Sequence, residues 1–478
     1  MNRSFFSKNI QRLLPASVLA VLLLAGCGIT QKYNRPDVLP TEGALYRGAG
    51  TGDTTTIAAI PWTDFFPDPQ LQSLIRRGID SNLNLRIAIT RIEAAQAALR
   101  QSRDAFLPAL SVTPEVRRAR GSLAQIRATN PNIAVQPSDY TLYSLLGNAS
   151  WEVDVWGRLR SNRRAAFANL LQTDAARLAV QTRLIADIAN NYFALLAYDQ
   201  QLRITESTIA NRQSFLQTVR ALKEAALLTG ADIAQSEANL YAAEATLPQL
   251  KQNIRETENA LSILLALPPD TIYRATLSQQ ILNDSLATGV PAQLLSYRPD
   301  VLAAEQALRN AFELTNVART NFYPQLVLSA SGGFATANTL SGFFSNSFYG
   351  ALIAGATAPI LNRGLFRQQY RTAQAQQEEA FLRFKNVVLV AGQEVSDALF
   401  SRQMATEKAA ARTRQIEALL RAVDYTKKLL DYGPNINYND VLLAEQNLLS
   451  AQLAGVSDTL QNLQSRVNLY RALGGGWR

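Results

Sequence analysis

Two long stretches of the chain mix apolar and polar positions without a helix breaker. Residues 158–229 contain neither Gly nor Pro and are rich in Ala, Leu, Gln and Arg, which are good helix formers. One continuous helix there would be about 100 Å long at ~1.5 Å per residue. Residues 365–432 repeat this pattern and are interrupted only by Gly392. Globular helices typically run about 8–20 residues, so these stretches predict a strut or a tube.

Each long helix lies between a pair of strand-like segments and a return helix. Gly230 and Gly433 follow the long helices, and return helices are predicted over 232–267 and 438–473. Pro248 is expected to kink the first of them. Alternation of apolar residues with small or polar ones predicts four strands, at about 107–118, 138–156, 324–335 and 348–360.

The second half of the chain repeats the first. Residues 440–448, DVLLAEQNL, align with residues 232–240, DIAQSEANL, at an offset of 208 positions. We therefore predict one tandem duplication rather than an array of short repeats. Its parts are a first repeat at 61–268, a connector at 269–297, a second repeat at 298–473 and a C-terminal tail at 474–478.

The N-terminus has the pattern of a removable leader. Residues 1–26 combine a basic start with an apolar run too short to span a bilayer as a helix. The run closes on Leu24-Ala25-Gly26-Cys27, which is similar to a bacterial lipoprotein box. We predict cleavage before Cys27 and acyl chains such as palmitate on that residue; the alternative is an ordinary signal peptide with a chance Cys. Residues 27–60 would then form a lipidated arm with little regular structure.

Composition narrows the possible chemistry. Without Arg3, Lys8 and Arg12 of the leader, 44 basic residues face 38 acidic ones, which leaves about +6. That charge is too small and too scattered to indicate a nucleic-acid partner. The chain has no His, and Cys27 is its only Cys, so a Cys–His pair, a His-assisted triad and a His or multi-Cys metal site are excluded. We predict no catalytic residue, no metal and no cofactor beyond a covalent lipid on Cys27.

The strand segments suggest a membrane barrel shared between chains. Four strands cannot close around a lumen, and open strand edges are not tolerated in lipid. Three chains would supply twelve strands, an allowed even number. Aromatic residues towards both ends of these segments resemble the girdles of membrane barrels, although they could also be core residues of a soluble sandwich. They are Phe106, Trp151, Trp156, Phe322 and Tyr323 at one end, and Tyr140, Tyr143, Phe334, Phe343, Phe344, Phe348 and Tyr349 at the other.

A basic segment follows the first predicted strand. Arg117, Arg118 and Arg120 are expected to open a polar loop that runs to Pro137. One interpretation is that this loop contacts anionic lipopolysaccharide. The more ordinary interpretation is a solvated loop.

Several motifs, spread over nearly the whole mature chain, carry a family resemblance. They are Tyr33-Asn34-Arg35-Pro36, Asp68-Pro69-Gln70-Leu71, Asn82-Leu83-Asn84-Leu85, Trp151-Glu152-Val153-Asp154-Val155-Trp156-Gly157-Arg158, Arg298-Pro299-Asp300-Val301 and Phe322-Tyr323-Pro324. With these motifs the chain resembles the outer membrane factors, the TolC-like trimeric exit ducts, and among them the OprM/NodT-type efflux lipoproteins.

The resemblance implies a mainly α fold with a membrane β-barrel. Each chain would supply four strands and long helical hairpins to a homotrimer with a 12-stranded β-barrel and a 12-helix α-barrel in the periplasm. Residues 269–297 would join an equatorial belt. The implied partners are a periplasmic membrane-fusion adaptor, an inner-membrane pump of the RND type and outer-membrane lipid. The implied function is passive efflux, as in multidrug resistance; the alternatives are type I protein secretion and a structural periplasmic lipoprotein.

Gating is expected at the periplasmic helix tips, where a residue facing the threefold axis occurs three times in one ring. Relatives often carry an aperture Asp and an Arg in a Leu-Asp-Ala-Gln-Arg motif, and these positions are Ala444 and Asn447 here. Each candidate could equally be a solvated or packing residue. The candidate gate residues are Asp232, Glu237, Tyr432, Tyr438, Asp440, Glu445 and Asn447.

Overall fold

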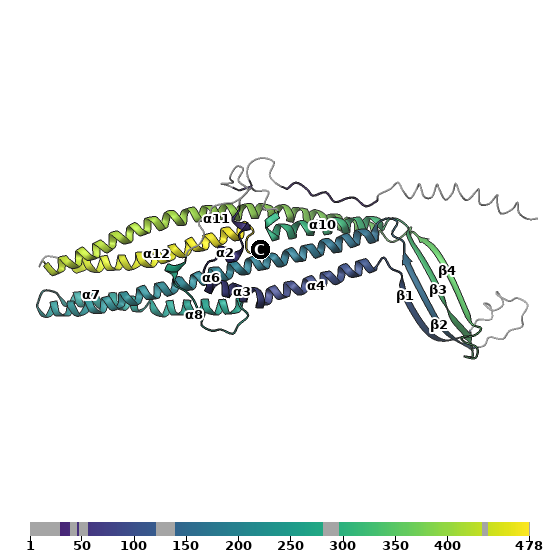
Figure 1. Cartoon of the computed structure of the whole chain (residues 1–478), viewed down its shortest axis with the longest axis horizontal. Coiled ribbons are helices and arrows are strands. Elements are labelled where there is room, and N and C mark those ends of the chain that lie inside the picture. Colours follow the sequence, from purple (N-terminus) through teal and green to yellow (C-terminus); the bar gives the residue numbers. More distant parts are fainter. Residues whose placement is uncertain are drawn as a thin grey trace, which may run out of the picture. The chain divides into compact units, whose positions relative to one another are not determined.

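The computed structural model describes residues 29–38, 45–46, 56–120, 139–280, 296–432 and 438–477. Over these residues the chain is mainly helical and carries a four-stranded sheet (Figure 1). It divides into two compact units, each assembled from three segments of the chain. The first comprises Met1–Pro36, Glu93–Leu171 and Gln306–Leu382; the second comprises Asp37–Ile92, Gln172–Glu305 and Arg383–Arg478.

The sheet lies in the first unit and takes two strands from each sequence repeat. Its order is β1-β2-β3-β4 and every neighbouring pair is antiparallel, so the four expected strands are confirmed. The strands are β1 (Ala109–Arg120), β2 (Asp139–Glu152), β3 (Gln325–Ala337) and β4 (Phe348–Thr357).

One expectation about the first strand is wrong. Residues Arg117 to Arg120 do not open a loop, because β1 continues through them in register with the start of β2. Arg118 lies opposite Thr141, and Arg120 lies opposite Asp139. Cross-strand pairing and a favourable charge pair therefore override the polar composition that suggested a loop.

The register gives the two faces of the sheet different chemistry, since side chains alternate along each strand. One face carries mostly apolar residues: Leu110, Val112, Val116, Tyr143, Leu145, Leu328, Phe334, Phe348 and Leu352. The opposite face is richer in polar residues: Ser111, Thr113, Glu115, Ser144, Asn148, Ser150, Ser329 and Ser331. Residues of β1 and β4 are almost all exposed, and within the described chain these edge strands pair on one side only.

Four long helices have residues in both units: α4 (Leu83–Asp104), α6 (Arg158–Glu224), α10 (Pro299–Thr320) and α11 (Leu365–Tyr432). The start of α6 is fixed by Asp154, whose carboxylate accepts hydrogen bonds from the backbone N–H groups of Leu159 and Arg160, both at 3.0 Å. The helix ends at Glu224 instead of Thr229, because Ala226 adopts the left-handed conformation with φ 63°.

The second unit holds the return helices and a compact apolar core. The first return helix is broken rather than kinked, into α7 (Gly230–Glu244) and α8 (Leu247–Leu264), with Pro248 in the first turn of α8. The second, α12 (Tyr438–Ala472), is continuous. Shorter elements complete the unit: η1 (Ile57–Ala59), α2 (Trp62–Phe65), α3 (Pro69–Ser81) and η2 (Leu277–Gln279).

The core of this unit packs side chains from distant parts of the sequence. Phe65 stacks on Tyr470 with a centroid distance of 4.1 Å, and the same cluster includes the fully buried Tyr192. Arg298, only 5% exposed, donates to the carbonyl of Ala472 and pairs with Glu394. This pairing explains the Arg298-Pro299-Asp300 motif as a structural clamp on the end of α12. None of the described helices is both long and apolar enough to cross a membrane.

The sheet predicts a strict requirement for Gly333. A Cβ atom there would lie 2.1 Å from the carbonyl oxygen of Leu145 on the neighbouring strand. Gly333→Ala should therefore force the strands apart and lower the free energy of unfolding by about 3 kcal/mol. Gly355→Ala on β4 is the control, because nothing lies within 4 Å of its added Cβ. Thermal unfolding followed by circular dichroism checks both, and equal stability of the two variants would contradict the register described here.

Candidate functional site

The sequence-predicted gate residues lie where the long helices meet their return helices, in the second unit. Asp232 and Glu237 are on α7, and Asp440, Glu445 and Asn447 are on α12. Tyr432 ends α11 and Tyr438 begins α12, but their side chains are outside the described part of the structure. Cys27 is also outside the described residues.

Asp232 has a local partner at the start of α7. Its carboxylate accepts hydrogen bonds from the backbone N–H and the hydroxyl of Thr229, both at 2.7 Å. These bonds lower the pKa of Asp232 below its ordinary value. The residue thus completes a capping box that begins α7.

Glu237 ties α7 to α6. Its carboxylate lies 2.9 Å from the guanidinium of Arg220, and both side chains are partly exposed. Apolar side chains from the two helices pack beside this pair: Ile209 and Leu216 from α6, with Leu240 and Ala243 from α7. The first hairpin is therefore held mainly by an apolar seam, because an exposed ion pair contributes only about 0–1 kcal/mol.

The second hairpin, α11 with α12, is held by a buried carboxylate. Asp458, 2% exposed, lies 2.7 Å from Lys408 and 2.8 Å from Arg412. Burial alone would raise the pKa of Asp458, but the hydrogen bonds from Arg412 and Lys408 outweigh it and lower the pKa below its ordinary value.

Arg212 joins the two hairpins. It is 6% exposed, and its guanidinium donates to the carbonyl of Asn239 on α7 at 2.5 Å and to the side chain of Gln446 on α12 at 3.0 Å. Burial lowers the pKa of Arg212, and the nearby charge of Glu445 offsets part of that effect. An apolar contact lies next to it, where Val219 of α6 packs on Leu442 of α12.

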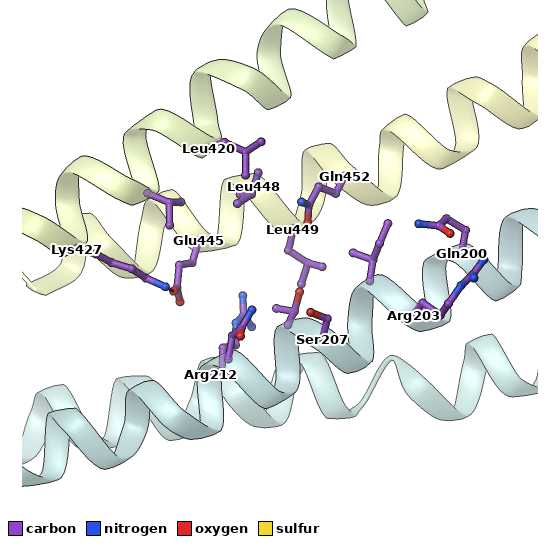
Figure 2. Close-up of a pocket in the computed structure, with 14 residues that line it drawn as sticks. Gln200, Arg203, Ser207, Arg212, Leu420, Lys427, Glu445, Leu448, Leu449 and Gln452 are labelled. Atoms are coloured by element: carbon purple, nitrogen blue, oxygen red, sulfur yellow. Dashed lines mark ion pairs between the residues drawn. The ribbon is translucent and has the colours of Figure 1, made fainter. Parts of the chain in front are cut away.

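Glu445 on α12 and Lys427 on α11 form a further polar contact beside this junction (Figure 2). Their charged groups are 2.6 Å apart, and Lys427 also lies 5.6 Å from the ring centroid of Phe215 on α6. One carboxylate oxygen of Glu445 and the Nε of Arg212 are buried without a hydrogen-bond partner among the described residues. Both groups border a cavity of about 360 Å³ between α6, α11 and α12.

The cavity is polar and has an excess of basic groups. Arg203, Arg212 and Lys427 line it together with a single acid, Glu445. It has room for water or a small polar molecule, but it brings together no nucleophile with a base. Among the described residues, no cluster of His, Cys, Asp or Glu is suited to hold a metal ion.

The structure assigns different surroundings to the two positions at which the chain departs from the resembled family. Ala444 is buried at 9% exposure, so that position packs within the chain. Asn447 is exposed, as is Asp440. Arg212 and Lys427, two of the residues that join the hairpins, were not predicted from the sequence. Nothing in the sequence distinguishes them from the many other basic residues on the same long helices.

Comparison with known proteins agrees with this architecture. The family model for outer membrane efflux proteins matches residues 74–267 and 290–475. The chain is 30% identical over 466 residues to the pyoverdine export outer membrane protein OpmQ of Pseudomonas aeruginosa, covering 96% of each chain. It is 28% identical over 471 residues to the probable efflux pump outer membrane protein TtgC of Pseudomonas putida, covering 97% of this chain and 96% of TtgC.

Two solved structures have the same fold. The outer-membrane channel OprN superposes with a TM-score of 0.85 at 24% identity, over 94% of this chain and 100% of OprN. The open state of the Neisseria gonorrhoeae MtrE outer membrane channel superposes with a TM-score of 0.83 at 26% identity, over 95% of this chain and 99% of MtrE.

The buried position of Asp458 predicts a pH-dependent hairpin. Because its folded pKa is depressed, its stabilising contribution is complete above the unfolded value of about 3.9 and is lost as pH falls through the folded value. Asp458→Asn should lower the free energy of unfolding by about 2 kcal/mol at pH 7. Breaking a fully buried ion pair costs ~3–5 kcal/mol, and the loss is smaller here because Lys408 is half exposed. Thermal unfolding at pH 7 and pH 3 measures both effects.

The matched control for this change is Asp424→Asn. Asp424 pairs with Lys428 one turn away on the surface of α11, and both side chains are exposed. We expect Asp424→Asn to change the free energy of unfolding by no more than about 0.5 kcal/mol. If both variants lose the same stability, or if Asp458→Asn keeps the acid sensitivity of the wild type, the assigned role of Asp458 is wrong.

Proposed function

Because the chain belongs to the outer membrane efflux protein family, we propose that it is the trimeric outer-membrane exit duct of a tripartite efflux system. Members of this family are channel components of efflux systems and not enzymes, as expected from the composition. The observation that carries the proposal is a sheet with two open edges and one apolar face. Such a sheet is stable in lipid only when its edges are closed.

The strand order supports closure by three copies. In the order β1-β2-β3-β4, the two edge strands run in opposite directions. Pairing β4 of one chain with β1 of the next therefore keeps every pair antiparallel. Three copies give twelve strands, which suits a membrane barrel. The apolar face would then contact lipid and the polar face would line the lumen.

The names of the relatives support small organic molecules as substrates. TtgI and SrpC of Pseudomonas putida are described as toluene and solvent efflux pump outer membrane proteins, and OpmQ as a pyoverdine export protein. We propose that this duct conducts such molecules passively from a periplasmic adaptor and an RND-type inner-membrane pump. Type I protein secretion is less favoured by these names, and a strut without a pore leaves the amphipathic sheet unexplained.

A lipid anchor on Cys27 fits the path of the residues that follow it. The side-chain amide of Asn316 on α10 both donates to the carbonyl and accepts from the N–H of Gln31, each at 3.0 Å. Nearby, Arg319 donates to the carbonyl of Ile29. These bonds hold the arm against the end of α10 that leads into β3. We propose that they keep the anchor close to the base of the barrel.

Gating is proposed at the junction of the two hairpins. The bond from Arg212 to Gln446 crosses this junction, as does the packing of Val219 on Leu442, whereas the bond from Arg212 to Asn239 lies within the first hairpin. Movement of the second hairpin away from the first would break the Arg212–Gln446 bond while leaving the Asp458 contacts within that hairpin intact. The closed state of the duct is therefore proposed to depend on Arg212, with Glu445 and Lys427 beside it.

We expect the wild type to be an outer-membrane trimer that carries acyl chains on Cys27. Native mass spectrometry of the purified protein should give three copies and a lipid-sized mass increment on the N-terminal Cys. Cys27→Ala should lose that increment and show reduced recovery in the outer-membrane fraction, since several acyl chains anchor a protein more strongly than one or none. A wild-type protein recovered as a soluble periplasmic monomer would contradict the duct itself.

Conductance across a planar bilayer tests the duct and its closure together. The trimer should conduct ions in brief openings, and Arg212→Gln should raise the open-to-closed ratio about tenfold, because charged hydrogen bonds contribute ~1.5–3 kcal/mol. Arg203→Gln is the control: Arg203 lines the same cavity but makes no hydrogen bond or ion pair within the described chain. Failure of every variant to conduct would refute the pore, and equal behaviour of both variants would refute the role of Arg212.

A further inference from the structure

One face of β1 changes from apolar to basic at the end of the strand that precedes the β1–β2 connection. Leu110, Val112 and Val116 share this face, and at the same period of two the next residues are Arg118 and Arg120. Val116 lies opposite Tyr143, the last large apolar pair before the arginines. A lipid-facing surface that becomes basic in this way is leaving the hydrocarbon and entering the headgroup region.

The two guanidinium groups are arranged around one carboxylate. Asp139, the first residue of β2, lies 3.3 Å from Arg118 and 3.8 Å from Arg120. The arginine side chains remain 76% and 71% exposed, so most of their N–H donors face outward. Arg117 and Glu115 occupy the alternate positions and point to the opposite face. The outward cluster therefore keeps a net positive charge with free donors.

The backbone beneath the cluster is well fixed. Thr141, which lies opposite Arg118, donates its N–H to the side chain of Asn338 at 2.8 Å and accepts from the N–H of Asn338 at 2.7 Å. Asn338 itself adopts the left-handed conformation, with φ 62°, directly after β3. The three adjoining strands thus hold the arginines at a defined height on the sheet.

We propose that Arg118 and Arg120 form a binding site for the phosphate groups of lipopolysaccharide in the outer leaflet. The opposite end of the sheet continues into the long helices α6 and α11, whereas this end carries the strand connections. With the helices in the periplasm, the arginines face the outer leaflet, whose glycolipid bears phosphates on its sugar headgroup. Arginine binds phosphate through two parallel N–H···O bonds, and Asp139 holds both guanidinium groups facing outward.

This proposal rests on the proposed outer-membrane barrel. Neutralising lipid phosphates with fixed guanidinium groups would replace the divalent cations that otherwise bridge them, and would seal the lipid around the duct. The site takes a phosphorylated glycolipid rather than free phosphate, since the apolar face below the arginines offers a surface for the acyl chains of the same molecule. Leu110 and Val112 on that face are 78% and 70% exposed.

The test uses the full-length trimer in phospholipid nanodiscs with added lipid A, and counts bound lipid by native mass spectrometry. The double variant Arg118→Ala/Arg120→Ala should weaken lipid A binding about tenfold or more. The double Lys variant should recover only part of the affinity, because Lys keeps the charge but not the paired geometry.

Arg117→Ala is the control, because it removes one positive charge from the same strand but on the opposite face. It should leave lipid A binding unchanged. Equal loss in Arg117→Ala and in the double Ala variant would overturn the site, as would equal binding of dephosphorylated lipid A by the wild type. Competition by millimolar inorganic phosphate would overturn the glycolipid as the ligand. Conductance of the same preparations separates the two proposals, because a double Ala variant that conducts normally but loses lipid A leaves the duct intact.

Discussion

The main constraint on this protein is that the backbone N–H and C=O groups at the outer edges of β1 and β4 need hydrogen-bond partners. Within the described part of the chain, the outer sides of β1 and β4 carry rows of N–H and C=O groups without a partner strand. Water can satisfy them, but hydrocarbon cannot, and each group left unpaired in lipid costs several kcal/mol. In a membrane, a single chain would therefore leave these edge groups without hydrogen-bond partners. Under the proposed function, self-association is therefore the condition for closing these edges into a barrel.

Away from the sheet, a few buried charges supplement the apolar core and the apolar seam of the helices. Arg298 clamps the C-terminal end of α12, and Asp458 links α11 to α12 within one hairpin. Removing one partner leaves the other as an unpaired buried charge, so these contacts resist separation. Arg212 differs because it joins the two hairpins and its Nε–H has no hydrogen-bond partner among the described residues. The Arg212 contact, one of several between the hairpins, is therefore less completely satisfied than the Asp458 contacts within the second hairpin.

Periodicity was enough to predict the element order, the four strands and the duplication, because helical and strand patterns persist over many residues here. Periodicity did not predict the ends of helices and strands that are set by the backbone conformation of one residue or by one cross-strand pair. The left-handed Ala226 ends α6 early, and the pairing of Arg120 with Asp139 extends β1 into a polar segment. The joining role of Arg212 depends on α7 and α12, whose contacts are remote in sequence. Such a role cannot be derived from a helix that carries many similar arginines.

The duplication also explains how equivalent positions acquired different roles. Glu237 and Glu445 occupy the same place in the two repeats, and each pairs with a basic residue on its own long helix. Glu237 remains one-third exposed and serves only its own hairpin, whereas the side chain of Glu445 is 10% exposed and faces Arg212 of the other hairpin. Burial strengthens the field of Glu445 on Arg212, because less water screens it. A repeated local ion pair has thus become, in the second repeat only, part of the contact between hairpins. The neighbouring Ala444 is also buried, so this part of α12 packs within the chain.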